Sequence, residues 1–293
     1  MSGRHRTLAI AAPFAWMLTF FVAPLAIVLK ISFSESTAER PPYAPLFEMG
    51  TDGGIAFQPS VSAYLLLLSD SLYFDAFLGS LRIAAVSTFV CLLIGLPMAY
   101  AIARSRPERR NLLVLLVMLP FWTSFLIRVY AWMALLKPTG ILNNVLISLG
   151  LVDEPLPLMN NDFAVHLGIV YSYLPFMVLP IYAALEKMDW TLVEAAADLG
   201  CRPLRTFFAV TTPLCWHGIA AGSLLVFIPA AGEFVIPDLL GGPDTLMVGR
   251  VLWTEFFINR DWPAAAALTI AMLSVLLLPI LAFQRMGVDT DRP

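Results

Sequence analysis

Six apolar runs of about twenty residues each dominate the sequence. They cover residues 8–30, 80–103, 112–136, 163–185, 214–237 and 264–284. A helix of about twenty residues spans roughly 30 Å, the thickness of the hydrocarbon core of a bilayer. The runs are longer than the segments of about ten residues that form membrane β-barrels. Since 59% of the residues are hydrophobic and only 13% are charged, the sequence predicts an all-α membrane protein with one domain over residues 1–293.

The positions of the basic residues predict how the six helices cross the membrane. Arg4 and Arg6 precede the first run, and the densest basic cluster lies between the second and third runs. Cytoplasmic loops of membrane proteins are enriched in Lys and Arg, so both features place these segments in the cytoplasm. The first run is longer than the apolar part of a signal peptide, and we interpret it as a retained helix. Both termini are then cytoplasmic. Eleven of the eighteen basic residues fall on the predicted inner side: Arg4, Arg6, Arg104, Arg106, Arg109, Arg110, Lys187, Arg202, Arg205, Arg285 and Arg292.

The long outer segment between the first two runs, residues 31–77, is acidic. It carries six carboxylates against the single basic residue Arg40. Such a face would attract a cationic substrate or a basic docking partner. It is equally explained as a solvated loop kept free of basic residues by the topology rule. We expect short interfacial helices at Val61–Leu68 and at Ile141–Leu149.

Residues 189–213 are too polar to cross a bilayer, and their pattern predicts a helix–turn–helix. Thr191 and Glu194 have the spacing of a capping box, which makes Thr191 the expected N-cap. Gly200 is the expected end of the first helix, and Pro203 suits the first turn of a second. If the first helix continued, Glu194, Asp198 and Arg202 would form one polar ridge.

The sequence carries no pattern typical of an enzyme or a metal site. A phosphate-binding loop needs a lysine after a glycine, and none of Lys30, Lys137 and Lys187 has one. The three histidines and three cysteines are scattered, so neither a metal site nor a disulfide framework is indicated. Any ATP-driven activity would therefore need another polypeptide. Arginine clusters flanked by membrane spans give no support for nucleic-acid binding.

Two charged residues within apolar runs are candidates for a transport pathway. Glu233 lies in the fifth run and Arg128 in the third. Ionisable residues inside membrane helices are costly and commonly mark a substrate or ion route. Glu233 could bind a cationic amine with help from aromatic faces, or it could pair with Arg128 and hold two helices together. Further candidates for this pathway are Trp122, Tyr130, Trp132, Tyr171, Tyr173 and Asp238.

The segment after the fourth run resembles the coupling loop of bacterial ABC-importer permeases. Glu194-Ala195-Ala196, Gly200, Val210 and Pro213 match the spacing of that motif, although Val210 replaces the usual isoleucine and Thr212 the usual leucine. Several other stretches are similar to permeases of polyamine importers, the putrescine type in particular. These are PFWTSFLIRVYAWM (120–133), SYLPFMVLPIYAALEKMD (172–189), VFIPAAGEFVIPDLLGGPD (226–244), NRDWP (259–263) and PPYAPLFEM (41–49).

The resemblance implies a type I ABC-importer permease fold in the inner membrane of a bacterium. The implied partners are a second homologous permease, two cytoplasmic ATPases that bind ATP and Mg²⁺, a periplasmic polyamine-binding protein and membrane lipid. No cofactor is expected on this chain. The residues implied to dock into the ATPase are Glu194, Ala195, Ala196, Asp198, Gly200 and Arg202.

Three alternatives remain open at this stage. The cargo could be spermidine or another small cationic solute instead of putrescine. The chain could be an ion-coupled secondary transporter that uses Glu233 and Arg128, although this leaves residues 189–213 without a purpose. It could also be a scaffold that transports nothing.

Overall fold

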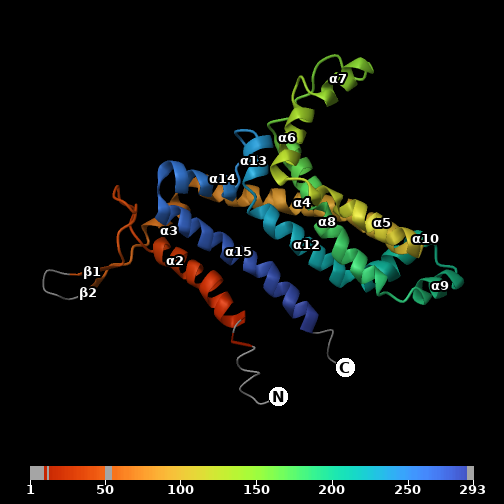
Figure 1. Cartoon of the computed structure of the whole chain (residues 1–293), viewed down its shortest axis with the longest axis horizontal. Coiled ribbons are helices and arrows are strands. Elements are labelled where there is room, and N and C mark those ends of the chain that lie inside the picture. The colour runs from red at the N-terminus through yellow and green to blue at the C-terminus, as the bar shows by residue number, and fades with distance from the viewer. Residues whose placement is uncertain (1–9, 12, 50–54, 289–293) are drawn as a thin grey trace. The chain divides into compact units, whose positions relative to one another are not determined.

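The computed structural model describes residues 10–11, 13–49 and 55–288, which divide into two compact units. The first unit comprises Met1–Asp75 and Val251–Val275, and the second comprises Ala76–Arg250 and Leu276–Pro293. The described residues are almost entirely helical, as predicted (Figure 1). Arg4, Arg6 and Arg292, on which the predicted orientation partly depends, lie outside the described residues.

The first unit is built from both ends of the sequence. Its elements are η1 (Leu18–Val22), α2 (Ala23–Ser32), β1 (Phe47–Met49), β2 (Ile55–Phe57), α3 (Ser62–Ser69), η4 (Thr254–Asn259) and the first half of α15 (Trp262–Val288). The two short strands pair as an antiparallel hairpin, an addition to the predicted all-helical fold. The Tyr73 hydroxyl donates to the buried Glu255 carboxylate over 3.0 Å. Tyr43 stacks on Trp262 with ring centroids 6.1 Å apart, which ties the outer segment to the start of α15.

The second unit is built mainly from the middle of the sequence. Its main helices are α4 (Ser71–Arg104), α5 (Pro107–Met118), α6 (Phe125–Leu136), α7 (Ile141–Ser148), α8 (Asp162–Glu186), α12 (Trp216–Ala231), α13 (Val235–Leu240) and α14 (Val248–Trp253). The helices α8 and α12 lie side by side (Figure 1). Their contact includes Gly218 and Gly222, whose missing side chains allow the backbones to approach closely.

Within the described residues, five helices are long and apolar enough to cross a membrane. They are Pro13–Ser32, Ser71–Arg104, Phe125–Ser148, Asp162–Glu186 and Trp262–Arg285. A sixth crossing requires the pair Pro203–Leu214 and Trp216–Ala231, which is bent by 73°. The short helices α3 and α7 correspond to the two helices predicted at Val61–Leu68 and Ile141–Leu149, and their interfacial location stays a prediction.

Two of the predicted spans are interrupted. The span expected over 112–136 is broken by η2 (Leu119–Trp122) and by extended backbone at Thr123. Pro120 lies in this break, and proline lacks the N–H that a continuous helix would use. The span expected over 214–237 ends at Ala231, and α13 begins separately at Val235. Prolines elsewhere, such as Pro175 and Pro180 in α8, are accommodated inside helices.

Candidate functional site

Glu233 lies in the break between α12 and α13, not inside a helix as the sequence predicted. Its carboxylate oxygen Oε1 accepts hydrogen bonds from the backbone N–H groups of Phe234 and Val235, over 3.2 and 3.0 Å. The first N–H groups of a helix have no partner within the helix. The Glu233 side chain therefore caps α13, and this local bonding accounts for the interruption of the predicted span. The residue is 8% exposed.

The second carboxylate oxygen of Glu233 joins the cap to α8. Oε2 accepts a hydrogen bond from the Tyr173 hydroxyl. The Tyr173 ring lies 6.1 Å from Phe176, which lies 5.0 Å from Phe121 at the end of η2. A row of aromatic rings thus leads from Glu233 across α8 to the break before α6.

Arg128 lies at the other end of this aromatic row. Its guanidinium carbon lies 5.6 Å from the Phe121 ring centroid and 5.7 Å from that of Phe125. The side chain is buried, yet Nε and Nη1 have no hydrogen-bond partner among the residues that the structure describes. Such unsatisfied buried donors are costly. Arg128 is therefore a buried cation that lies against two aromatic faces.

Glu233 and Arg128 do not form an ion pair in this structure. Within the described part of the chain, the ion pairs shorter than 4 Å are Arg82–Asp162 and Arg250–Asp238. The carboxylate and the guanidinium instead lie at the two ends of the ring row, and Arg128 is close enough to Tyr173 to interact electrostatically with its hydroxyl. Both charges are thus buried, and neither has an ion-pair partner among the residues that the structure describes.

The remaining pathway candidates are not gathered at one point. Trp132 contacts Tyr171 edge to face, with ring centroids 5.4 Å apart. Trp122 and Tyr130 are exposed. Asp238, on α13, is engaged with Arg250 at 3.7 Å. The structure therefore brings Tyr173 to Glu233 and Tyr171 to Trp132, and leaves the other aromatic candidates apart.

Phe121 and Phe176 connect Tyr173 to Arg128, and neither was predicted from the sequence as a site residue. Both are phenylalanines in apolar runs, where helical periodicity does not distinguish a residue in such a row from an ordinary packing residue. The only signal was their position next to other candidates, since Phe121 precedes Trp122 and Phe176 follows Tyr173 by three residues. On a helix, residues three apart lie on the same face.

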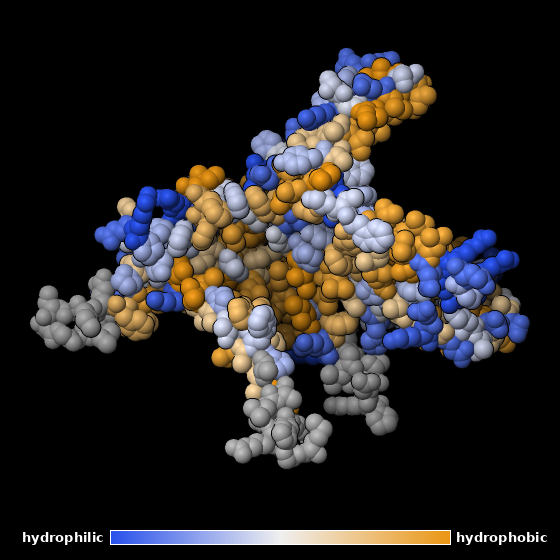
Figure 2. All heavy atoms as spheres, viewed as in Figure 1, coloured by the Kyte–Doolittle hydropathy of each residue, from blue (hydrophilic) through white to orange (hydrophobic). Residues whose placement is uncertain are grey.

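The predicted helix–turn–helix is present in residues 191–206. Helix α9 (Thr191–Asp198) ends before Gly200, whose φ of 76° lies in the left-handed region that glycine adopts readily. Helix α10 (Pro203–Thr206) begins at Pro203 as predicted. Figure 2 shows hydrophilic residues gathered over α9 and α10, whereas hydrophobic residues cover the neighbouring α5.

Two local predictions for this segment are wrong. Thr191 is the first residue of α9, and its N–H and hydroxyl both donate to the Asp189 carboxylate, over 3.0 and 2.8 Å. These bonds stabilise the ionised form and lower the pKa of Asp189. The ridge of Glu194, Asp198 and Arg202 does not form, because α9 ends at Asp198 and Arg202 has an extended backbone.

Aromatic contacts fasten this segment to the end of α4. The Tyr100 ring lies 5.9 Å from Trp190 and 5.2 Å from Phe207, which flank α9 and α10 on either side. The guanidinium carbon of Arg104 lies 5.2 Å from the Trp190 ring. Packed rings thus connect both ends of this segment to α4. Leu199 and Leu204 beside the turn are 89% and 76% exposed, so an apolar surface faces away from these anchors.

Residues 91–286 match the family model described as "Binding-protein-dependent transport system inner membrane component". The chain belongs to this family of inner-membrane permeases. It is 39% identical over 287 residues to the "Spermidine/putrescine transport system permease protein PotB" of Haemophilus influenzae, with 97% of this chain and 95% of the relative covered. It is 44% identical over 218 residues to PotB of Escherichia coli strain K12, with 74% of this chain and 79% of the relative covered. The resemblance to the polyamine branch is thus confirmed.

Solved structures of ABC importers share the fold. A chain of a bacterial transporter involved in the import of the acidic polysaccharide alginate matches with a TM-score of 0.69, covering 98% of both chains at 16% identity. A chain of the MetNI methionine ABC transporter matches with a TM-score of 0.58, covering 80% of this chain and all of that chain at 16% identity. The predicted fold class is confirmed by these neighbours.

Proposed function

We propose that this chain is one of two permease subunits of an ABC importer that carries a polyamine, with putrescine as its preferred cargo, into the cytoplasm. The observation that carries the proposal is the identity of 39% over almost the whole chain to a permease named for spermidine and putrescine transport. The preference for putrescine rests on the resemblance of segment 41–49 to the putrescine type.

The cluster of Glu233, Tyr173 and the neighbouring rings supports a cationic cargo. A primary ammonium group needs anionic or dipolar oxygen acceptors, and aromatic faces add favourable cation–π contacts. The Glu233 carboxylate has only neutral partners, so its charge remains available to an approaching cation. We propose that pairing of Glu233 with Arg128 and binding of the cargo alternate during transport. The buried Arg128, which lacks an ion-pair partner among the described residues, supplies the counter-charge.

The partners of the complex follow from the same proposal. A second permease completes the path, a periplasmic binding protein delivers the cargo, and two cytoplasmic ATPases hydrolyse ATP. The exposed turn around Glu194, Ala195, Ala196, Asp198, Gly200 and Arg202 docks into an ATPase, and Tyr100 passes its movement to α4. This places α9, α10 and both termini on the cytoplasmic side.

Radiolabelled putrescine uptake tests the role of Glu233. Cells that lack this protein would be complemented with wild type, Glu233→Gln or Glu255→Gln. Glu255 is a matched control because it is equally buried and also accepts a hydrogen bond from a tyrosine. Loss of one charged hydrogen bond of about 1.5 kcal/mol or more should raise the apparent KM about tenfold for Glu233→Gln, while Glu255→Gln transports normally.

The same cells distinguish the proposed cargo from its alternatives. Unlabelled putrescine should compete best, spermidine more weakly, and a basic amino acid should not compete. Stronger competition by spermidine would reverse the proposed preference. Uptake that is independent of this chain, or unchanged kinetics for Glu233→Gln at equal abundance in the membrane, would count against the proposed cargo and pathway respectively.

Reversal of the charge at Glu194 tests the docking surface. We expect Glu194→Arg to abolish co-purification of the ATPase or to uncouple ATP hydrolysis from uptake, because Glu194 is exposed on α9 and its charge is available to a partner. The amount of chain in the membrane is the control. Normal co-purification together with normal coupling would remove α9 from the proposed interface.

A further inference from the structure

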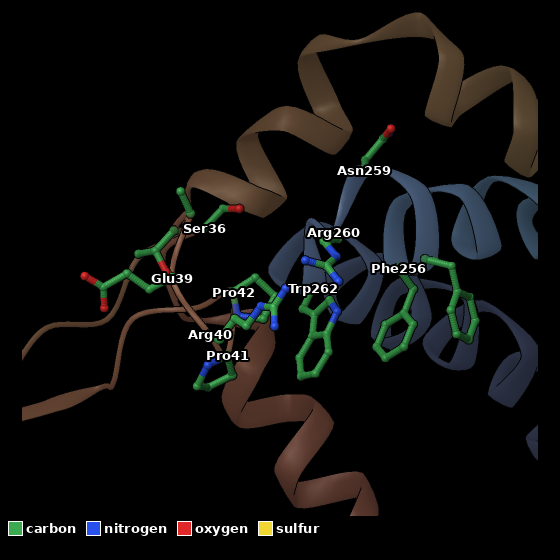
Figure 3. Close-up of a pocket in the computed structure, with 12 residues that line it drawn as sticks. Ser36, Glu39, Arg40, Pro41, Pro42, Phe256, Asn259, Arg260 and Trp262 are labelled. Atoms are coloured by element: carbon green, nitrogen blue, oxygen red, sulfur yellow. The ribbon is translucent and has the colours of Figure 1, made fainter.

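A pocket in the first unit combines two arginines with an aromatic wall. Its volume is about 760 Å³, and residues 36–42 line one side while Phe256, Asn259, Arg260 and Trp262 line the other. Figure 3 shows the guanidinium groups of Arg40 and Arg260 beside the Trp262 ring, whereas the Glu39 carboxylate points away from them. The two arginines belong to segments far apart in the sequence, so the fold brings these charges together.

The charges of this pocket favour an anion. Neither Arg40 nor Arg260 takes part in an ion pair within the described residues, where the pairs are Arg82–Asp162 and Arg250–Asp238. Glu39 is the one acidic residue that lines the pocket, so the lining carries a net positive charge. The planar guanidinium group binds phosphate oxygens in a two-pronged geometry, which makes paired arginines suited to phosphate.

A second, apolar cavity shares a wall with the arginine pocket. It has a volume of about 280 Å³, and both cavities are lined by Phe256, Phe257 and Trp262. The other lining residues are Val28, Ile31, Leu252, Ala265, Ala266 and Thr269. From Trp262 to Thr269 this cavity follows α15 for about 10 Å, at 1.5 Å per helical residue. It thus continues from the charged pocket along the surfaces of α2 and α15.

The two cavities lie where a membrane boundary is expected. The candidate spans Pro13–Ser32 and Trp262–Arg285 respectively end and begin beside the arginine pocket. Tryptophan is enriched at the level of the lipid headgroups, and an arginine at this level can form charge-assisted hydrogen bonds to a headgroup phosphate. A ligand that fits both cavities has an anionic head at the boundary and an apolar tail directed into the membrane.

We propose that these cavities bind an anionic phospholipid, whose phosphate contacts Arg40 and Arg260 and whose acyl chain lies along α2 and α15. A soluble phosphate compound would leave the apolar cavity without an occupant. This site goes beyond polyamine transport and is separate from the residues proposed for it. In this arrangement, Trp262 lies between the lipid headgroup and the acyl chain.

Native mass spectrometry of the purified transporter complex tests the proposal. Delipidated wild type would be supplied with dioleoyl phosphatidylglycerol, dioleoyl phosphatidylcholine or glycerol phosphate, and compared with Arg40→Gln/Arg260→Gln and with Val28→Phe, which fills the apolar cavity. Lys137→Gln removes an exposed positive charge elsewhere and is the control. Arg260→Lys keeps the positive charge, so it provides a second test of the site if the double variant fails to fold.

We expect phosphatidylglycerol to bind wild type and the Lys137→Gln control equally. The double variant should bind it on the order of thirtyfold more weakly, at about fivefold per arginine, and Val28→Phe should weaken it without any change of charge. Arg260→Lys should bind with intermediate affinity. Equal binding to the double variant, or equal binding of phosphatidylcholine by wild type, would overturn the anionic headgroup site. Binding of glycerol phosphate as tight as that of the lipid would overturn the role of the apolar cavity.

Discussion

Gly218 is the position where a single methyl group should most clearly disturb the contact between α8 and α12. An added Cβ would lie 2.7 Å from the Ala184 Cβ, 2.7 Å from the Pro180 carbonyl oxygen and 3.1 Å from the Ile181 Cα. Ordinary contact begins at 3.4 Å, so the closest approaches are about 0.7 Å too short. These atoms are backbone or are fixed directly to it, so they cannot move unless α8 shifts as a whole.

Two opposing effects determine how much Gly218→Ala changes the free energy of unfolding. Overpacking of a tight contact costs about 1–3 kcal/mol, while replacing glycine by alanine within a helix gains roughly 1 kcal/mol. Because the closest atoms belong to the backbone or are fixed to it, the overpacking cost lies in the upper part of this range, and we expect Gly218→Ala to lower the free energy of unfolding by about 1–2 kcal/mol. For a chain of this size, that corresponds to a fall in the unfolding midpoint of roughly 2–8 °C.

Gly232→Ala is the matched control for this experiment. Apart from its neighbours in the sequence, no heavy atom of the described residues lies within 4 Å of the Cβ that it would add, and its φ of −92° suits alanine. Thermal unfolding of the purified transporter complex in detergent, followed by the loss of its monodisperse peak in size-exclusion chromatography, should show a shift for Gly218→Ala alone. A Gly218→Ala midpoint equal to that of wild type would show that α8 and α12 can move apart at little cost in free energy, and would refute this prediction.

Two further predictions concern the exposed segment. Gly200→Ala forces alanine into a left-handed conformation at a cost of about 1–2 kcal/mol, so we expect a changed angle between α9 and α10 and less stimulation of ATPase activity by loaded binding protein; full stimulation would contradict this. Thr191→Val removes one hydrogen bond to Asp189, whose lowered pKa should then rise toward its ordinary value. The bond stabilises the folded state above the pKa of the unfolded chain, and this contribution is lost as pH falls through the lower folded pKa. Aspartate-selective ¹³C NMR titration measures the change, and an unaltered pKa would count against the assignment.

The sequence predicted helices well where composition alone determines them. The apolar run 163–185 corresponds to α8, Asp162–Glu186, because twenty consecutive apolar residues have few other ways to satisfy their backbone in lipid. Gly200 and Pro203 were equally informative, since each acts through its own backbone geometry. In these cases, the residues that determine a helix or its end lie within a few positions of it in the sequence.

The predictions failed where a side chain bonds to the backbone or where a partner lies far along the sequence. Hydropathy averaged over a run detects no break at Pro120 or Glu233, because the flanking residues remain apolar. The bond from Tyr173 to Glu233 joins residues sixty positions apart. Spacing along one helix predicts nothing about such a bond. The glycines at 218 and 222 carried a usable signal that was overlooked, since two glycines four residues apart commonly mark a close helix contact.

The interruption at Glu233 also explains how a buried carboxylate is tolerated between two apolar helices. A carboxylate inside a continuous helix finds no free backbone N–H groups, whereas the start of α13 offers two. The same break that disrupts the span thus supplies the donors that stabilise the charge. Among the described residues, Arg128 Nε and Nη1 have no hydrogen-bond acceptor, and the guanidinium group lies against the rings of Phe121 and Phe125. The anion is therefore the better stabilised of the two charges in this conformation. A rearrangement of α6 that brings Arg128 to Glu233 would give the guanidinium group an ion-pair partner, but it would weaken the hydrogen bonds from Glu233 to the start of α13. Because the gain and the loss oppose each other, the two arrangements can have similar free energies.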